Sequence, residues 1–176
     1  MHKNTSIVLM YGLLAALGLV IVTVLLYLGG VNFFLSGTAY IGYVLIIALA
    51  VLATHKQKKL NGGYLDFREA LRIAFTVLVL AMLAQSLFSY ILFNFIDKDF
   101  KNAVTQATLE RTEQWLKKMG MPEYQINKAI EEEQSKDQFS PARISLGFAV
   151  SCIFQFIVAL IIAAFTKKKN PEAPLS

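Results

Sequence analysis

The chain has 176 residues, of which 56% are hydrophobic and 16% are charged, against about 25% charged in an ordinary soluble domain. The hydrophobic residues gather in blocks that are too long for a soluble core of this size, which excludes a water-soluble fold. The net charge of +5 comes from basic residues beside these blocks and so argues against a nucleic-acid partner, and the single cysteine excludes an intrachain disulfide.

The first two predicted elements share one uncharged run. From Asn4 to Thr54 the sequence holds 51 positions without Asp, Glu, Lys or Arg. A helix that crosses the bilayer needs about 20 apolar residues, so the run predicts two spans, at 6–28 and 35–54. The apolar part of the first span is longer than the roughly 7–15 residues of a signal-peptide core, and we expect it to stay as an anchor.

Turn and capping residues mark the ends of these spans. Gly29-Gly30 ends the first helix, and the stretch Phe33 to Gly37 extends the second helix through the interface. Asn61-Gly62-Gly63 forms a turn before the third helix. Asp66 and Glu69 have the spacing of a capping box, in which Asp66 accepts from exposed backbone N–H groups and Glu69 reaches back to the start of the helix.

The third and fourth spans are predicted at 68–96 and 142–166, and the hydrophilic segment 97–141 separates them. This segment reads as two amphipathic helices, because its apolar residues recur at helical spacing, Gly120 ends the first helix and Pro122 begins the second. Ser140-Pro141 caps and opens the fourth span. The apolar positions of the first amphipathic helix are Phe100, Ala103, Val104, Ala107, Trp115, Leu116 and Met119.

Together these elements predict an all-α fold, an integral membrane four-helix bundle with an amphipathic helical hairpin in the long loop between spans 3 and 4. The whole chain, 1–176, forms one domain, and its two-proline end, 170–176, is expected to be disordered.

The distribution of basic residues predicts the orientation, because cytoplasmic segments are enriched in Lys and Arg. The first connecting loop has no Lys or Arg, and the stretch from Asp97 to Arg143 has eight spread over its length. Both termini are therefore expected in the cytoplasm of a bacterium, with 97–141 outside the inner membrane. Nine basic residues lie in the much shorter terminal segments and second loop: Lys3, Lys56, Lys58, Lys59, Arg68, Arg72 and Lys167 to Lys169.

The cores of the four spans contain no ionisable residue, and such residues usually mark pumps, transporters and proton relays. Gln85 and Gln155 lie near the middle of the third and fourth spans. We expect their carboxamides to bond to each other and to hold the two helices together. The alternative is a polar path for a substrate, which Ser86, Ser89 and Ser151 would extend.

Small residues recur at four-residue spacing in two spans, and this spacing lets helices approach closely. The pairs are Gly12 with Ala16 and Gly147 with Ser151. We expect them to serve packing within the chain more than a dedicated dimer interface.

No residue pattern indicates a catalytic, cofactor-binding or metal-binding site. His2 and His55 have no partner at ligand spacing, and Cys152 is expected to be a small buried apolar residue. The basic clusters 56–59 and 167–169 either set the topology or bind anionic lipid headgroups.

Several short motifs, taken in order, are similar to the Bacteroidota membrane family labelled DUF4199. Lys98 stands where that family usually has proline, and Met121-Pro122-Glu123 stands where it usually has Ser-Glu-Glu. The resemblance implies a four-span inner-membrane protein and brings no known activity. The motifs are Tyr11-Gly12-Leu13, the basic exit before Gly62-Gly63, Phe67 with Ala70, Phe95 to Phe100, Gly120 to Glu123 with Ile126, Phe139-Ser140-Pro141, and a lysine cluster after the last span.

The favoured hypothesis is a non-enzymatic accessory or scaffold subunit of an envelope complex, embedded in the lipid bilayer and contacting a membrane or periplasmic protein through 97–141. That segment could instead pack on the span ends or lie in the membrane interface. A second hypothesis is a small transporter or lipid-handling protein with a polar groove around Gln85 and Gln155. A membrane enzyme is the third, and it would need Glu110, Glu113 and Glu123.

Overall fold

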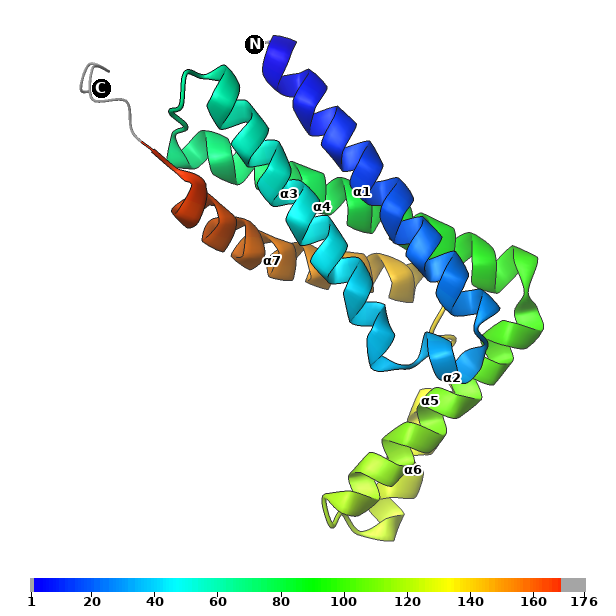
Figure 1. Ribbon diagram of the computed structural model, residues 1–176. Coiled ribbons are helices and arrows are strands. Elements are labelled where there is room, and N and C mark those ends of the chain that lie inside the picture. The colour runs from blue at the N-terminus through cyan, green and yellow to red at the C-terminus, as the bar shows by residue number, and fades with distance from the viewer. Residues whose placement is uncertain (1, 169–176) are drawn as a thin grey trace.

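The computed structural model describes residues 2–168, and four long helices dominate it (Figure 1). All four are long and apolar enough to cross a membrane, which confirms the prediction of an all-α, four-span protein. A π-helical segment, Leu92–Ile96, continues the third of them. The helices are α1 (His2–Leu28), α3 (Tyr40–Leu60), α4 (Phe67–Ile91) and α7 (Pro141–Thr166).

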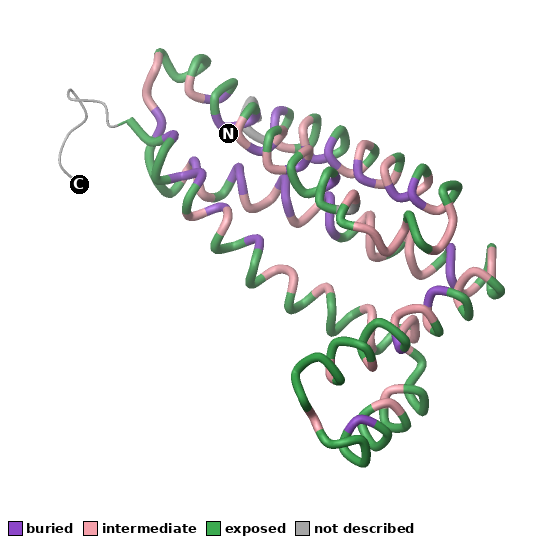
Figure 2. Tube along the Cα trace, turned by 60° about the horizontal axis from the view of Figure 1, so that its bottom comes forward, coloured by how far each residue is buried: buried purple, intermediate pink, exposed green. Residues whose placement is uncertain are grey.

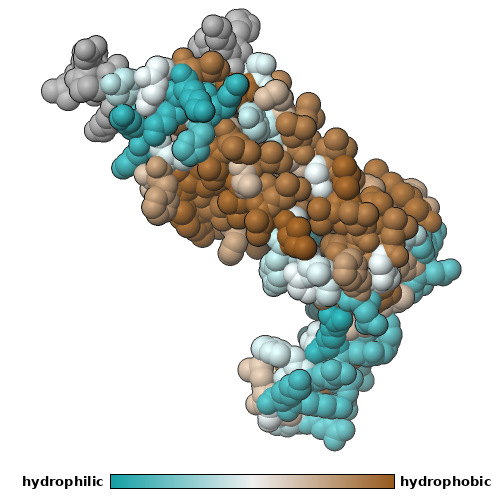
Figure 3. All heavy atoms as spheres, in the orientation of Figure 1, coloured by the Kyte–Doolittle hydropathy of each residue, from teal (hydrophilic) through white to brown (hydrophobic). Residues whose placement is uncertain are grey.

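The surface of the bundle is apolar along its middle. Figure 3 shows hydrophobic side chains over the visible face of the four helices, with hydrophilic residues gathered at the end where α1 begins and on the segment that follows α4. Large apolar side chains such as Leu13, Leu17, Val150 and Ile157 are at least half exposed. Contiguous apolar surface on this scale is stable in lipid and not in water, so the belt marks the part of the molecule that contacts the bilayer.

Helix α4 is the centre of the bundle, because it packs against α1, α3 and α7. Its buried face is built from small side chains, and Ala70, Ala74 and Ala81 are fully buried. A Cβ placed on Gly12 of α1 would lie only 2.6 Å from Cδ1 of Leu80 on α4. Such close approach is typical of helix pairs in membranes, and here Gly12 serves packing within the chain as predicted.

The second span differs from the predicted range 35–54. Residues Val31–Phe34 form a separate short helix, α2, and a 3-10 turn at Gly37–Ala39 precedes α3, which runs from Tyr40 to Leu60. The ring of Phe34 packs edge-on against Phe93, with centroids 5.7 Å apart, and this contact holds α2 off the line of α3. Lysines at 56–59 continue the helix, because lysine is a good helix former and its stem can lie along apolar surface.

Two helices, α5 (Lys98–Lys118) and α6 (Glu123–Gln134), pack against each other and leave the bundle at the end away from the start of α1 (Figure 1). We call them the α5–α6 hairpin, and we call the two ends of the bundle the hairpin end and the termini end. Figure 2 shows that the hairpin is largely exposed. Gly120 has φ of 75°, and the N–H of Met121 donates to Leu116 O at 3.3 Å, which ends α5 as a Schellman turn does. Pro122 is the N-cap residue of α6, so α6 begins at Glu123, one residue later than predicted.

At the termini end, the second loop is tied to the end of α7. Leu65 and Lys168 form an antiparallel bridge with backbone N···O distances of 2.9 and 2.8 Å. Lys58 Nζ donates to Thr166 O at 2.8 Å. Part of the predicted basic cluster therefore anchors the chain to itself. Lys169 and the tail 170–176 lie outside the described residues.

The predicted capping box does not form. Asp66 is the N-cap residue of α4, but its side chain makes no capping bond. The Glu69 carboxylate instead accepts from Gln57 Nε2 at 3.3 Å and from Asn61 Nδ2 at 3.1 Å. Gln57 is 2% exposed, and a buried amide requires partners, so it draws Glu69 away from the start of its own helix.

Candidate functional site

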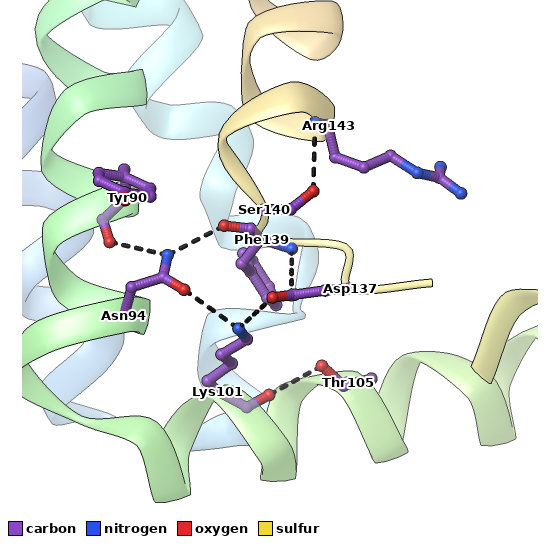
Figure 4. A network of polar contacts seen from close by, with 8 residues as sticks. All are labelled: Tyr90, Asn94, Lys101, Thr105, Asp137, Phe139, Ser140 and Arg143. Carbon is purple, nitrogen blue, oxygen red and sulfur yellow. Dashed lines mark hydrogen bonds and ion pairs between the residues drawn. The ribbon is translucent and has the colours of Figure 1, made fainter. Parts of the chain in front are cut away.

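The base of the α5–α6 hairpin is held by a polar network that joins three parts of the chain (Figure 4). Asn94 Nδ2 donates to Phe139 O at 2.9 Å and to Tyr90 O at 3.0 Å. Lys101 Nζ donates to Asn94 Oδ1 at 3.1 Å and to Asp137 Oδ2 at 2.8 Å. The end of the third span, the start of α5 and the loop before α7 are thus fixed to one another.

Asp137 is the acceptor on the loop side of this network. Its Oδ1 also accepts from the backbone N–H of Phe139 at 3.0 Å. The hydrogen bond from Lys101 is the main reason that the pKa of Asp137 lies below its ordinary value. Ser140 then caps α7 by accepting from Arg143 N at 3.4 Å, with Pro141 in the first helical turn, as predicted.

A second set of contacts ties the hairpin to α1 and α2. Tyr27 Oη donates to Asp97 Oδ2 at 2.8 Å, and an Arg111 guanidinium N–H donates to Leu35 O. Aromatic rings fill the space between: Phe93 stacks on Phe100 with centroids 6.1 Å apart, and its ring lies at a tilt of 30° to Phe139 with centroids 3.9 Å apart. The hairpin base is therefore packed as well as hydrogen-bonded, and the hairpin extends rigidly from the bundle.

The far end of the hairpin exposes large apolar side chains. Trp115 is 59%, Met119 60% and Tyr124 70% exposed, whereas Leu109 and Ile126 are buried between the two helices. Packing within the hairpin, one of the arrangements considered from the sequence, therefore covers only part of the apolar stripe. These three large side chains lie outside the predicted spans.

The acids that a membrane enzyme would need are not gathered into a site. Glu113 pairs with Lys117 at 2.6 Å and raises the pKa of that lysine, and Glu110 accepts from Gln106 at 3.1 Å. Glu133 pairs with Arg143 at 3.6 Å. Among the described residues no three His, Cys, Asp or Glu lie together as metal ligands would.

The predicted Gln85–Gln155 bond is wrong. Gln85 Oε1 lies 2.9 Å from Thr23 Oγ1 of α1, and Gln85 Nε2 donates to Ser89 Oγ at 3.2 Å. Helix α4 packs against both α1 and α7. Gln85 lies on the face of α4 that contacts α1, so it meets Thr23 and not Gln155. Thr23 is 5% exposed, so the Thr23–Gln85 contact lies inside the bundle.

Gln155 lines a separate groove between α3 and α7. Toward the hairpin end, α7 diverges from the rest of the bundle (Figure 2). The groove has a volume of about 480 Å³, and its walls include Tyr40 and Tyr43 from α3 and Gly147, Ser151 and Phe154 from α7. We call it the α3–α7 groove.

The Gln155 side chain is 2% exposed and lines the groove, and none of the hydrogen bonds found among the described residues involves its carboxamide. Leaving such a group unpaired costs about 1–3 kcal/mol. Ser151 Oγ donates to Phe148 O at 2.7 Å and so gives its proton to its own helix.

Gly147 was predicted to let two helices of the chain approach closely, but a Cβ built on it would meet nothing within 4 Å. This glycine opens the groove and does not draw two helices together. Tyr43 lines a smaller hollow of about 190 Å³ as well, which contains Thr23 and Gln85, so the two glutamines face different hollows on either side of this tyrosine. Cys152 is half-buried and free.

The network at the hairpin base was not found from the sequence. A signal was present, because Asn94 is a polar residue near the end of an apolar span and Asp137 stands two residues before Phe139. Their joint role depends on how α5 folds back, which residue spacing alone does not give.

Four membrane-length helices with an extramembrane helical hairpin define a multi-pass integral membrane protein. The chain belongs to the DUF4199 family, described as proteins of unknown function, and the family model matches residues 10–168. No curated protein and no solved structure matches the chain.

Proposed function

We propose that the protein is a non-enzymatic accessory or scaffold subunit of a bacterial envelope complex, which binds a partner protein through the α5–α6 hairpin. The observation that carries this proposal is a rigid base joined to an exposed apolar end. Lys101 and Asn94 fix the base, whereas Trp115, Met119 and Tyr124 remain at least 59% exposed. Exposed Trp, Tyr and Met side chains outside the membrane are typical of protein contact surfaces.

Charge favours a protein over a lipid surface as the occupant. Helix α6 carries four glutamates and one lysine, so an anionic bilayer would repel it. Opposite charges border the exposed aromatic side chains, with Lys117 and Lys118 near Trp115 and Glu123 beside Tyr124. A mixed polar rim around an apolar centre is the usual arrangement of a specific protein interface.

We also propose that the termini end faces the cytoplasm of the inner membrane. The described basic residues Lys56, Lys58, Lys59, Arg68, Arg72, Lys167 and Lys168 belong to that end, in keeping with the enrichment of Lys and Arg in cytoplasmic segments. Reporter tags at the two chain ends test this orientation. An active periplasmic reporter at either end would contradict it.

A photo-crosslinking amino acid placed at Trp115 and, separately, at Tyr124 tests the partner. Asn102, exposed on α5 near the hairpin base, is the matched control position. We expect one and the same protein adduct from both test positions and none from Asn102. Adducts to lipid alone would contradict the proposal.

The identified partner is then purified and its affinity measured for the full chain in nanodiscs. Trp115→Ala is expected to weaken binding by about tenfold or more, because buried aromatic anchors dominate interfaces. Glu110→Gln, a change on the side of α5, serves as the control and is expected to bind like the unchanged protein. Equal affinity for Trp115→Ala would overturn the role of the hairpin end.

The α3–α7 groove favours a second candidate, a lipid-handling protein. An apolar groove with one buried unpaired carboxamide is a feature that packing alone does not require. The two candidates use different parts of the molecule and can be tested separately.

A further inference from the structure

We propose that the α3–α7 groove binds a neutral membrane lipid of quinone type, that is, an apolar tail attached to a planar ring with carbonyl groups, and that Gln155 donates a hydrogen bond to a ring carbonyl. The groove volume of about 480 Å³ lies within the range of roughly 300–1,000 Å³ found for small-molecule sites. The argument rests on the depth of Gln155, on the charge of the groove and on its walls.

Depth excludes an ordinary headgroup as the partner of Gln155. In α7, which spans Pro141–Thr166, Gln155 comes 14 residues after the first residue and 11 before the last. At about 1.5 Å per residue it lies roughly 21 Å and 17 Å from the two helix ends, which is near the middle of the membrane. Phospholipid headgroups and their ester groups stay at the interface, so they do not reach this carboxamide.

Charge excludes an ionised ligand group in the groove. None of the residues that line it is charged, and an ion without a counter-charge is costly inside the bilayer. A carboxamide offers two N–H donors and one acceptor oxygen, all uncharged. Its natural partners at this depth are the carbonyl or hydroxyl groups of a neutral lipid.

The walls favour a planar ring. Tyr40 and Tyr43 from α3 and Phe154 from α7 place aromatic side chains on both sides of the groove. Aromatic faces and edges pack well on flat rings. Tyr43 also carries a hydroxyl, an uncharged polar group that suits a neutral ligand.

Access to the groove is lateral, from the lipid. Gly147 leaves its wall open, because a Cβ at this position would meet no atom within 4 Å. The backbone of α7 runs apart from the rest of the bundle toward the hairpin end (Figure 2). A lipid can therefore enter from the leaflet on that side without any rearrangement of the helices.

The test measures binding of decylubiquinone to the full chain in nanodiscs of phosphatidylcholine, with empty nanodiscs as the correction for partitioning. We expect saturable binding of one molecule per protein. Gln155→Leu is expected to weaken it about three- to tenfold, the loss of one hydrogen bond. Gly147→Phe is expected to weaken it more strongly, because the new ring fills the groove.

Ala149→Phe is the matched control, since Ala149 is exposed on α7 and does not line the groove. It is expected to bind decylubiquinone like the unchanged protein. All three variants should unfold at a temperature no lower than the unchanged protein, because Gln155→Leu removes an unpaired polar group and Gly147→Phe enters open space. This check separates loss of the site from loss of the fold.

The proposal is overturned if decylubiquinone shows no saturable binding, or if it binds equally to Gln155→Leu, Gly147→Phe and the unchanged protein. Displacement of decylubiquinone by phosphatidylglycerol at equal concentration would make the groove a general lipid surface and would also overturn it. A dimer in native mass spectrometry that Gly147→Phe dissociates would assign the groove to a second copy instead. Trp115→Ala is expected to leave quinone binding unchanged, so this test is independent of the hairpin proposal.

Discussion

The hydroxyl of Tyr27, near the end of α1, donates to the carboxylate of Asp97, 70 positions later in the chain, at 2.8 Å. The other Asp97 oxygen accepts from the backbone N–H of Phe100 at 2.8 Å and caps α5. The Tyr27 ring meets the Phe100 ring edge-on, with centroids 4.7 Å apart. One carboxylate therefore sets both the start of the hairpin and its attachment to the first span.

The first prediction separates these two roles of Asp97. Asp97→Ala removes the cap and the bond from Tyr27, and we expect hydrogen exchange in the first turns of α5 to become several-fold faster. Asp97→Asn keeps an N-cap acceptor and should have a smaller effect, as should Tyr27→Phe, which leaves the cap in place. Hydrogen exchange followed by mass spectrometry measures this order, and equal exchange in all variants would contradict it.

The hairpin base should loosen in acid. The Phe100 N–H and the Tyr27 hydroxyl lower the pKa of Asp97, and Lys101 lowers that of Asp137. A carboxyl whose pKa is depressed on folding binds fewer protons when folded, so its stabilisation is fully present above the unfolded pKa of about 3.9 and is lost as pH falls through the lower folded value.

Limited proteolysis of the loop between α6 and α7 measures this effect. We expect protection to be constant from neutral pH down to about 5 and to fall below about 4. Asp137→Asn removes one of the two titrating groups and should weaken the acid dependence. A loss of protection centred near neutral pH would show that other groups control the base.

Replacing Asn94 should lower the free energy of unfolding more than replacing an exposed asparagine does. Its side chain bonds to Phe139 O, Tyr90 O and Lys101, so Asn94→Leu leaves a backbone acceptor and a lysine without this partner. We expect a loss of about 1–3 kcal/mol in the free energy of unfolding. Asn102→Leu, at an exposed position on α5, is the control and should change stability little. Unfolding in a detergent titration compares the two.

A double-mutant cycle tests the polar contact inside the bundle. Thr23→Val and Gln85→Leu, alone and together, should give a coupling free energy of about 0.6 kcal/mol, the average for such bonds in membrane helices. The parallel cycle of Gln85→Leu with Gln155→Leu should give no coupling, because these side chains face different hollows. Coupling in the second cycle instead of the first would restore the pairing expected from the sequence.

The sequence predicted the parts of the fold that depend on composition and local order. The uncharged run from Asn4 to Thr54 predicted two spans because hydrocarbon excludes charge over any segment that crosses it. Ser140-Pro141 and Gly120 predicted helix ends because capping and left-handed turns are local. None of these inferences required knowledge of which helix lies beside which.

Apart from the shifted helix ends, the errors concern which residues are neighbours in space. Gln85 bonds to Thr23 because α1 packs beside α4 at that level, and sequence order favoured α7. Glu69 left its capping position because Gln57 of another helix is buried beside it. The second hypothesis placed Gln85 and Gln155 around one polar groove, whereas the groove at Gln155 is mostly apolar and does not include Gln85, because its make-up depends on how α3 and α7 are placed.

Two glycines with the same sequence signature should respond oppositely to Gly→Ala. A methyl group on Gly12 would lie 2.6 Å from Leu80 Cδ1, so Gly12→Ala must displace that side chain, and we expect a cost of about 1–3 kcal/mol in stability. A methyl group on Gly147 meets nothing within 4 Å, so Gly147→Ala gains helix propensity, about 1 kcal/mol in water. Thermal unfolding in one detergent measures both variants against the unchanged chain. Because both glycines begin a small-residue pair at four-residue spacing, equal responses would mean that α7 is packed at Gly147 as closely as α1 is at Gly12, and the α3–α7 groove would then have no open wall.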